Sequence, residues 1–397
     1  MINQAYLIES LAPLVFRSGK PFGSIASAQD ATFPLPSATA GMIRAMQIEQ
    51  QAGQYQDYQG RLNHEDYQEI LGIQSQGPFL ARFNPDHLDD YTILVPKPAN
   101  ALYFESREDK KTYLVRLAPT SFNNDLCGSD LPDGLLPVQM QSDLKGKPQS
   151  GVSYWSLAHF IAWQNGQQLS FEEVEKDGLK SLPIDIRTHV KIDAKTLSSE
   201  DGKLFQTASL DLGHSIETAQ NDHSGRKWHT ERYGFLVLSE QVLKQDLATL
   251  GGERRLSYFK PVKSTQNLKP SDDLLEKINQ NKGFSLSFLT PAVFENGYLP
   301  VWLDQNTLCG KLPHSEVEVK LEAIAIDRWL PVSGWDSIVW KPKATRKAVC
   351  SGSVYWFSLT TQMDEKTLQQ LWAQPISDHS QDQNDGFGVA IVSAWSK

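Results

Sequence analysis

The chain has 397 residues, 40% of them hydrophobic and 21% charged, which is the composition of a folded globular protein with room for two domains. Its 38 Lys and Arg against 47 Asp and Glu give a net charge of −9, which excludes a protein that grips nucleic acid over its whole surface. Three widely spaced cysteines exclude a disulfide framework or a zinc ribbon. The separated cysteines fit a reducing interior, so we expect a cytoplasmic protein, and because no apolar run reaches the roughly 18 residues of a membrane span, no membrane role is indicated.

The first predicted elements are a strand, a basic turn and a helix. The strand covers residues 6–16, and the turn after it carries Arg17 and Lys20. Apolar residues at helical spacing predict a helix over 37–50, with Arg44 in its first turns. Free backbone donors there could meet a phosphate, and the alternative is a surface arginine beside a packing glycine.

The stretch from residue 57 to residue 230 has poor periodicity and is predicted to be an insertion within the first domain. Its clearest feature is a long β-hairpin with alternating arms at 184–193 and 203–212. On the first arm, His189 and Lys191 share a face with Arg187 and would make a basic strip if that face is exposed. The alternative is a solvated edge strand whose charges prevent aggregation.

A helix, a glycine pair and a basic strand follow the insertion. Leucines at helical spacing predict a helix over 239–250, which ends at Gly251 and Gly252. Arg254 and Arg255 begin the strand after it.

A similar pattern recurs near the C-terminus, with strands predicted at 284–289, 317–326, 348–359 and 389–395, a helix at 364–373 and a weak helix at 303–309. The order strand, helix, strand, strand, helix, strand then fits both halves. The sequence therefore predicts an α+β protein of two tandem ferredoxin-like (RRM-like) domains: residues 1–265, with the insertion at 57–230 and its β-hairpin thumb, and residues 266–397.

The segment 341–357 sets a group of cations before a small-residue turn and an aromatic strand. Cations neutralise phosphates, and a glycine lets a backbone come close to a ligand, so this order suits an RNA-binding loop on a rigid mount. The alternative is a solvated loop before a core strand. The residues concerned are Lys341, Lys343, Arg346, Lys347, Gly352 and Ser353.

The usual catalytic signatures are absent from the sequence: it has no GxSxG elbow, P-loop, HExxH, CxxC pair or dinucleotide fingerprint. We therefore predict no cofactor, no metal site and no catalytic residue. One polar stretch concentrates possible ligands, but their spacing matches no metal site and indicates a solvent-exposed loop; they are Asp211, His214, Asp222, His223 and His229. His189 beside Lys191 could support a metal-free RNA cleavage, with histidine as base.

A series of motifs between residues 7 and 388 has the order found in one known family. They are LAPLVFRSGKPFG, FPLPSATAGMIRA, HVKID, KLFQT, LGGERRLSYF, SGWD, KPKATRKAVCSGSVYWF and GFG. This series resembles the RAMP-superfamily subunit that caps the crRNA 5′ end in type III-B CRISPR effector complexes, the third Cmr subunit.

The resemblance implies two tandem ferredoxin-like domains, glycine-rich loops that hold the 5′ handle of the crRNA, and a surface for the large polymerase-like subunit and the first backbone subunit. It also implies a non-catalytic subunit, whose hairpin looks like the thumb that other members press against guide or target RNA. The RNA-binding residues that it suggests are Arg17, Lys20, Arg44, His189, Lys191, Gly251, Gly252, Arg254, Arg255, Lys341, Lys343, Arg346, Lys347, Gly352 and Ser353.

Two other hypotheses remain open at this point. The first is a metal-independent endoribonuclease that processes guide RNA precursors through His189. The second is a protein scaffold that never contacts RNA.

Overall fold

The computed structural model describes residue 2 and residues 4–16, 32–51, 62–121, 129–213, 216–217, 230–263, 269–336 and 341–397. The chain forms two compact units, and it enters each of them more than once. Unit 1 consists of Met1–Thr92, Leu182–Thr265 and Pro331–Arg346, and unit 2 of Ile93–Ser181, Gln266–Leu330 and Lys347–Lys397. The predicted domain boundary at residue 265 and the extent of the insertion stay predictions.

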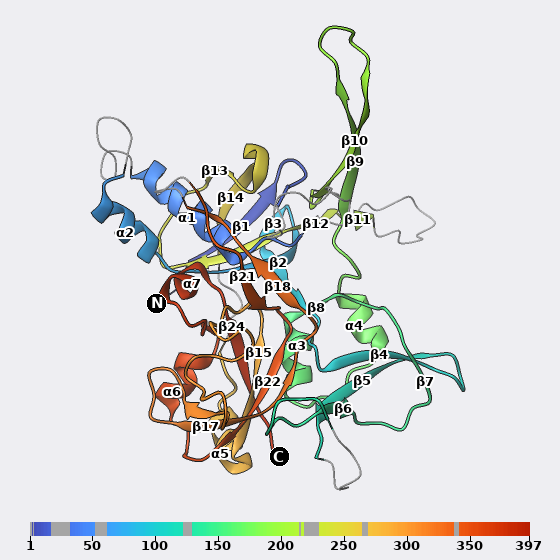
Figure 1. The fold of residues 1–397 in the computed structure, drawn as a ribbon, viewed down its shortest axis with the longest axis vertical. Coiled ribbons are helices and arrows are strands. Elements are labelled where there is room, and N and C mark those ends of the chain that lie inside the picture. Colours follow the sequence, from blue (N-terminus) through green and yellow to red (C-terminus); the bar gives the residue numbers. More distant parts are fainter. Residues whose placement is uncertain are drawn as a thin grey trace. The chain divides into compact units, whose positions relative to one another are not determined.

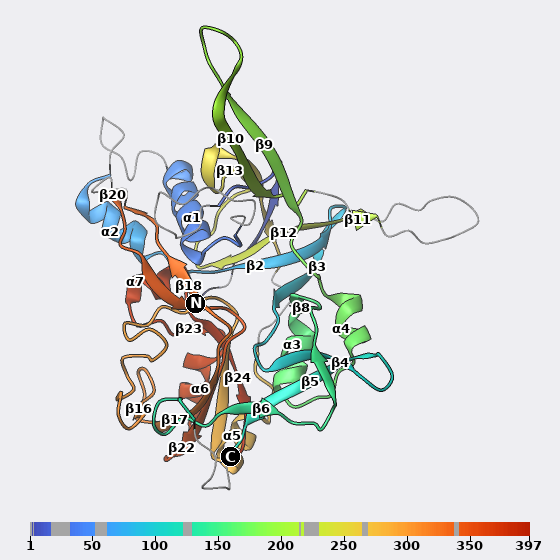
Figure 2. The same ribbon diagram turned by 45° about the vertical axis from the view of Figure 1, so that its right-hand side comes forward.

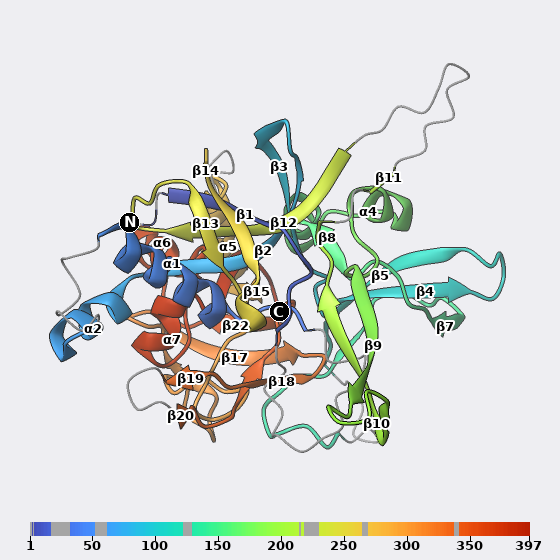
Figure 3. The same cartoon turned by 90° about the horizontal axis from the view of Figure 1, so that it is seen from above.

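Unit 1 is built on one sheet whose strands lie side by side in Figure 3, and its neighbouring pairs from β13 to β2 are antiparallel. Their order is β13 (Asp246–Thr249), β14 (Leu256–Val262), β1 (Gln4–Ser10), β12 (Thr230–Ser239), β2 (Ser75–Asn84) and β3 (His87–Pro96). Helix α1 (Pro36–Gln50) contacts β2 and β13, and its buried Met42, Ile43 and Met46 supply the apolar face. A shorter helix, α2 (His64–Gly72), begins at Asn63, whose side chain accepts a hydrogen bond from the Asp66 backbone.

The helix predicted over 239–250 is wrong, because this segment is extended and contains β13. Side chains from neighbouring elements bond the backbone groups that a helix would have used. The Tyr6 hydroxyl accepts from the Leu243 N–H at 2.8 Å. The Gln50 amide accepts from the Lys244 N–H at 2.8 Å and donates to its carbonyl at 3.0 Å. Tertiary hydrogen bonds therefore outweigh the helical spacing of the leucines.

The predicted hairpin is confirmed as β9 (Ile184–Ile192) and β10 (Ser199–Leu210), which pair antiparallel. Figures 1 and 2 show it as a two-stranded ribbon that extends away from the sheet of unit 1. The short strand β11 (Ile216–Glu217) follows it and pairs with β12.

Unit 2 contains a second sheet of β16 (Cys309–Lys311), β17 (Glu318–Ala325), β22 (Val354–Leu359), β15 (Gly283–Phe288), β24 (Val389–Ala394) and β23 (Gln374–Pro375), in that order. Its helices are α5 (Leu274–Asn281), α6 (Glu365–Leu371) and α7 (Ser380–Asp385). The weak helix predicted at 303–309 is wrong. The Asp304 carboxylate accepts from the Asn306 and Thr307 N–H groups, and these bonds hold a turn instead.

The strand predicted over 348–359 is interrupted by a turn. Its first part belongs to β21 (Arg346–Val349), which pairs with β18 (Trp329–Val332), and its second part is β22. Two short strands lie in the connection between β18 and β21, namely β19 (Trp335–Asp336) and β20 (Lys341–Pro342).

Much of the predicted insertion belongs to unit 2 and has a core of its own. Trp155 and Trp163 are fully buried there, and the Trp155 indole donates to the Tyr103 hydroxyl at 2.6 Å. The elements are β4 (Ala101–Ser106), β5 (Thr112–Pro119), β6 (Val138–Met140), β7 (Gly146–Pro148), β8 (Tyr154–Ser156), α3 (Leu157–Gln164) and α4 (Phe171–Asp177).

The chain thus has a mixed α/β structure made mostly of antiparallel sheets with few helices. None of the helices in the described ranges combines the length and the apolar character needed to cross a bilayer.

Candidate nucleic-acid interface

The loop 251–255 has an unusual backbone. Gly251, Glu253 and Arg254 have φ angles of 77°, 59° and 51°, and Gly252 to Arg254 form the 3₁₀ turn η2 (Gly252–Arg254). The Gly252 N–H donates to the Val15 carbonyl at 2.7 Å, and a Cβ on Gly251 would lie 2.6 Å from the same oxygen. The left-handed bend is therefore held against the N-terminal segment, and only a glycine fits its first position.

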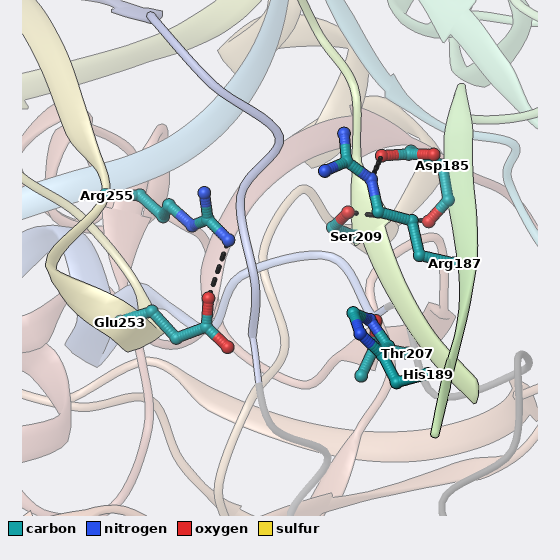
Figure 4. Close-up of polar contacts among 7 residues, drawn as sticks. All are labelled: Asp185, Arg187, His189, Thr207, Ser209, Glu253 and Arg255. Carbon is teal, nitrogen blue, oxygen red and sulfur yellow. Dashed lines mark hydrogen bonds and ion pairs between the residues drawn. The ribbon is translucent and has the colours of Figure 1, made fainter. Parts of the chain in front are cut away.

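The cations of this loop are accessible. Arg254 is exposed, and within the described ranges its side chain takes part in no ion pair or hydrogen bond. Arg255 donates to the Glu253 carboxylate at 2.6 Å, as Figure 4 shows. Because both members of this pair are partly exposed, the pair contributes little stability, and Arg255 can exchange Glu253 for a phosphate.

The N-terminal segment connects this loop to the base of the hairpin. Leu14 exchanges both backbone hydrogen bonds with Leu210 of β10, each at 2.8 Å, while Val15 accepts from the loop. In Figure 4 this segment passes between the side chains of the loop and those of the hairpin. The next residues are Arg17 and Lys20, which lie outside the described residues. The structure thus places the end of the predicted first strand, at Leu14 and Val15, against both the hairpin and the loop 251–255.

The basic strip predicted on the hairpin is largely neutralised. The Arg187 Nε donates to Asp185 at 2.6 Å, and the Lys191 Nζ lies 2.8 Å from Glu200. Both arginine and lysine side chains remain exposed. Because these pairs are partly exposed, each contributes little stability, and a phosphate can displace their carboxylates as it can displace Glu253 from Arg255.

His189 is held by two neighbours on β10. Its ring stacks on Phe205, with centroids 5.3 Å apart, and its Nε2 lies 2.9 Å from the Thr207 hydroxyl (Figure 4). These contacts give His189 a packing role on the ribbon.

Arg44 does not face solvent. It is buried, and its Nη2 donates to the carbonyls of Leu71 and Ile73, each at 3.1 Å, at the C-terminal end of α2. The guanidinium thus satisfies carbonyls that a helix end leaves without partners. The predicted phosphate contact of Arg44 is therefore wrong, because its side chain is buried against α2. Helix α2 was not predicted from the sequence, so this partner could not be foreseen.

The turn that contains Gly352 and Ser353 is enclosed, and this corrects its predicted exposure to RNA. Ser353 is fully buried. The Gly352 N–H donates to Phe288 at 2.7 Å, and its carbonyl accepts from Ala99 at 2.8 Å. A Cβ on Gly352 would overlap the Lys97 carbonyl oxygen. The glycine is therefore required by packing inside unit 2, where it is buried.

The basic residues that precede this turn are more exposed than the turn itself. Lys341 and Lys343 are exposed, and no ion pair of either occurs in the part of the chain that the structure describes. The Lys347 Nζ lies 5.5 Å from the centroid of the exposed Trp329 ring. Arg346 is half-buried. Of this predicted group, the three lysines remain available to a ligand.

The unit 1 sheet contains a buried carboxylate, that of Glu9, which was not predicted from the sequence. Glu9 on β1 accepts from the Lys260 Nζ on β14 at 2.6 Å and from Arg232 on β12. Burial opposes its ionisation, but the hydrogen bonds and charges of the two cations hold the pKa of the Glu9 carboxyl below its ordinary value. Only the strand register brings these residues together, so their positions in the sequence carry no signal.

Among the described residues, no group of three or more His, Cys, Asp or Glu side chains is placed to hold a metal ion. Asp211 is described, whereas His214, Asp222, His223 and His229 lie outside the described residues.

Comparison with known proteins then identifies the family. The sequence model of the family described as "CRISPR-associated protein (Cas_Cmr3)" matches residues 6–395. The chain belongs to this family. Membership confirms the resemblance, drawn from the motifs, to the third Cmr subunit of type III-B effector complexes. A search of curated proteins found no match.

Solved structures similar to this Cas_Cmr3 chain share little sequence with it. A chain of a cryo-EM structure of the type III-B Cmr-beta bound to cognate target RNA has 14% identity and a TM-score of 0.48, covering 97% of this chain and 96% of that chain. A chain of the same complex with target RNA and AMPPnP has 14% identity and a TM-score of 0.46, covering 89% and 86%. A chain of the Csm3–Csm4 subcomplex of the type III-A interference complex has 12% identity and a TM-score of 0.37, covering 99% and 100%.

Proposed function

We propose that this chain is a non-catalytic guide-RNA-binding subunit of a type III-B CRISPR effector complex. It holds the 5′ handle of the crRNA, docks the large polymerase-like subunit and the first backbone subunit, and meets target RNA only indirectly. The observation that carries the proposal is the exposed left-handed bend 251–255, with its accessible Arg254 and exchangeable Arg255, in a member of the Cas_Cmr3 family.

The bend has the groups that bind a phosphate backbone. Arg254 and Arg255 provide charge, and the anchored segment that ends at Phe16 leads directly to Arg17 and Lys20. Together with Gly251 and Gly252 these residues form the first part of the proposed interface, and the exposed Lys341, Lys343 and Lys347 form the second. With a net charge of −9, we expect weak RNA binding by the isolated subunit and tight binding in the assembled cytoplasmic complex.

The strand orders support the proposed pair of ferredoxin-like domains. In unit 1, β1 lies between β14 and β12, and β2 follows β12; in unit 2, β15 lies between β24 and β22, and β17 follows β22. When the four strands of each set are numbered in chain order, the first strand lies between the fourth and the third, and the second strand follows the third. This is the strand order of a β-α-β-β-α-β unit. We propose that these two sets are the centres of domains 1–265 and 266–397.

The geometry of His189 supports a non-catalytic role. One face of its ring is covered by Phe205, and its Nε2 contacts Thr207. A metal-free ribonuclease needs a base and a cation that are both free to reach the scissile phosphate. Among the residues that the structure describes, no contact of His189 favours the ribonuclease hypothesis.

The test is the guide RNA content of the assembled complex purified with Arg254→Glu and Arg255→Glu together. We expect about a tenfold loss of bound guide RNA at physiological salt, because two phosphate contacts become repulsions. The matched control is Arg107→Glu together with Lys110→Glu, two exposed cations at a turn of unit 2, which changes the net charge by the same amount. Guide RNA retention equal to that of the control would favour the scaffold hypothesis. Cleavage of repeat RNA in EDTA that disappears in His189→Ala would favour the ribonuclease.

A further inference from the structure

One face of the unit 1 sheet is covered at one end and open at the other. Register places Leu7, Leu236 and the side chains of Leu247, Leu256 and Tyr258 on this face. Leu7 and Leu236 are buried, whereas Leu247, Leu256 and Tyr258 are 45%, 46% and 38% exposed. The open end adjoins the bend 251–255, because Leu256 is the first residue of β14. Three large apolar side chains next to a basic loop are typical of a binding surface.

Two cations border this apolar area on the same face. The buried Glu9 holds the Lys260 Nζ at 2.6 Å and also binds Arg232. The Lys260 Nζ lies 5.0 Å from the centroid of the Tyr258 ring. One carboxylate between two cations leaves one excess positive charge. The adjoining bend, in which Arg254 and Arg255 outnumber Glu253, adds a second.

We propose that this surface, the β13–β14 platform (Leu247, Leu256, Tyr258, Lys260 and Arg232), seats one unpaired nucleotide of the guide RNA. The base stacks on Tyr258 against the two leucines, and the phosphate contacts Lys260 or Arg232. The inference rests on the proposed function and deepens it, because it adds a base-contacting site to a bend that otherwise holds only phosphates.

Charge decides between RNA and a protein partner. An apolar protein surface would bury the excess positive charge of Arg232 and Lys260 without compensation, which is unfavourable. A nucleotide supplies both an aromatic ring and an anion, and single-stranded RNA is held by aromatic stacking together with cationic contacts to its backbone. Glu9 fixes the Lys260 ammonium over one face of the Tyr258 ring, so the base stacks on the other face, and Arg232, whose side chain is 41% exposed, is the more accessible cation for the phosphate.

The platform continues the path of the bend. Tyr258 stands three residues after Arg255 on an extended strand, which corresponds to about 10 Å. An RNA strand whose phosphates are held by Arg254 and Arg255 can therefore place its next nucleotides at Tyr258.

The experiment compares Tyr258→Ala with Tyr258→Phe in the assembled complex. We expect Tyr258→Phe to retain guide RNA like the wild type, because the ring remains, and Tyr258→Ala to release it on the order of tenfold faster in a salt challenge. The matched control is Tyr113→Ala, which removes a tyrosine of the same 38% exposure from unit 2. A second measurement irradiates the wild-type complex with ultraviolet light and identifies RNA-linked peptides by mass spectrometry; we expect an adduct on residues 256–262.

The outcomes separate this inference from the proposed function. Loss of guide RNA in the Arg254→Glu and Arg255→Glu variant, with no effect of Tyr258→Ala and no adduct, overturns the platform and leaves the proposed function standing. No effect of either variant contradicts both. If the complex that contains Tyr258→Ala loses a protein subunit but keeps its guide RNA, the surface docks a protein, and the proposed nucleotide site is wrong. If Tyr258→Ala fails to fold, the presence or absence of the wild-type adduct decides.

Discussion

Two glycine bends look alike in the sequence and differ in the folded chain. The bend at Gly251 and the turn at Gly352 both stand beside cations, both have a left-handed glycine with φ of 77° and 87°, and both approach a backbone carbonyl too closely for a Cβ. Yet Arg254 in the first bend is exposed, whereas Ser353 in the second turn is fully buried. A glycine near cations therefore predicts a tight turn. Whether that turn can meet RNA depends on which segment packs over it.

Gly352→Ala should give the largest effect and tests the enclosed turn. The new Cβ would overlap the Lys97 carbonyl and force an alanine into a left-handed conformation, so we expect a loss of about 3 kcal/mol in the free energy of unfolding. Chemical denaturation of the purified subunit measures it. The control Gly297→Ala has a similar φ of 76° and open space around the Cβ, so about 1 kcal/mol is expected. Equal losses in the two variants would mean that the turn is not closely packed.

Glu9→Gln should have the next largest effect and tests the sheet beside the exposed bend. The variant leaves Lys260 and Arg232 without their carboxylate, and because Arg232 is partly exposed we expect a loss of about 2 kcal/mol near neutral pH.

The pH dependence of this loss follows from the lowered pKa of Glu9. A carboxyl with a lowered pKa adds stability that is fully present above its ordinary value of 4.5 and disappears as the pH falls through the folded-state pKa. The difference between wild type and Glu9→Gln should therefore shrink as the pH is lowered below 4.5, as measured by urea unfolding at several pH values. A difference that does not change with pH would contradict the assigned ion pairs.

Gly252→Ala should have the smallest effect and tests how tightly the exposed bend is packed. Its Cβ would lie 3.4 Å from the Val15 carbonyl oxygen, so we expect a change in unfolding free energy within about 0.5 kcal/mol. The same denaturation assay applies. A loss comparable to that of Gly352→Ala would show that the bend is also tightly enclosed at Gly252, next to the closely packed Gly251, and the contrast in exposure between the two bends would fail.

Each of the two units has one of its predicted helices and lacks the other. Unit 1 has helix α1 between β1 and β2, but an extended segment occupies the place of the helix predicted over 239–250. Unit 2 has α6 between β22 and β24, but turns occupy the place of the helix predicted at 303–309. In both places hydrogen bonds from side chains satisfy the backbone groups, so the sheets keep similar strand orders with different helices.

The residues alone were enough to predict features that depend on local pattern. The alternating arms of the hairpin, the strands β15 and β24, the helix α6 and the family motifs all follow from neighbouring residues in the chain. Only the tertiary structure decided which of the predicted RNA-binding residues reach solvent, because burial of Arg44 and Gly352 depends on segments far away in the sequence. It also decided that Glu9, Arg232 and Lys260 meet, since cross-strand register joins residues that no sequence spacing relates.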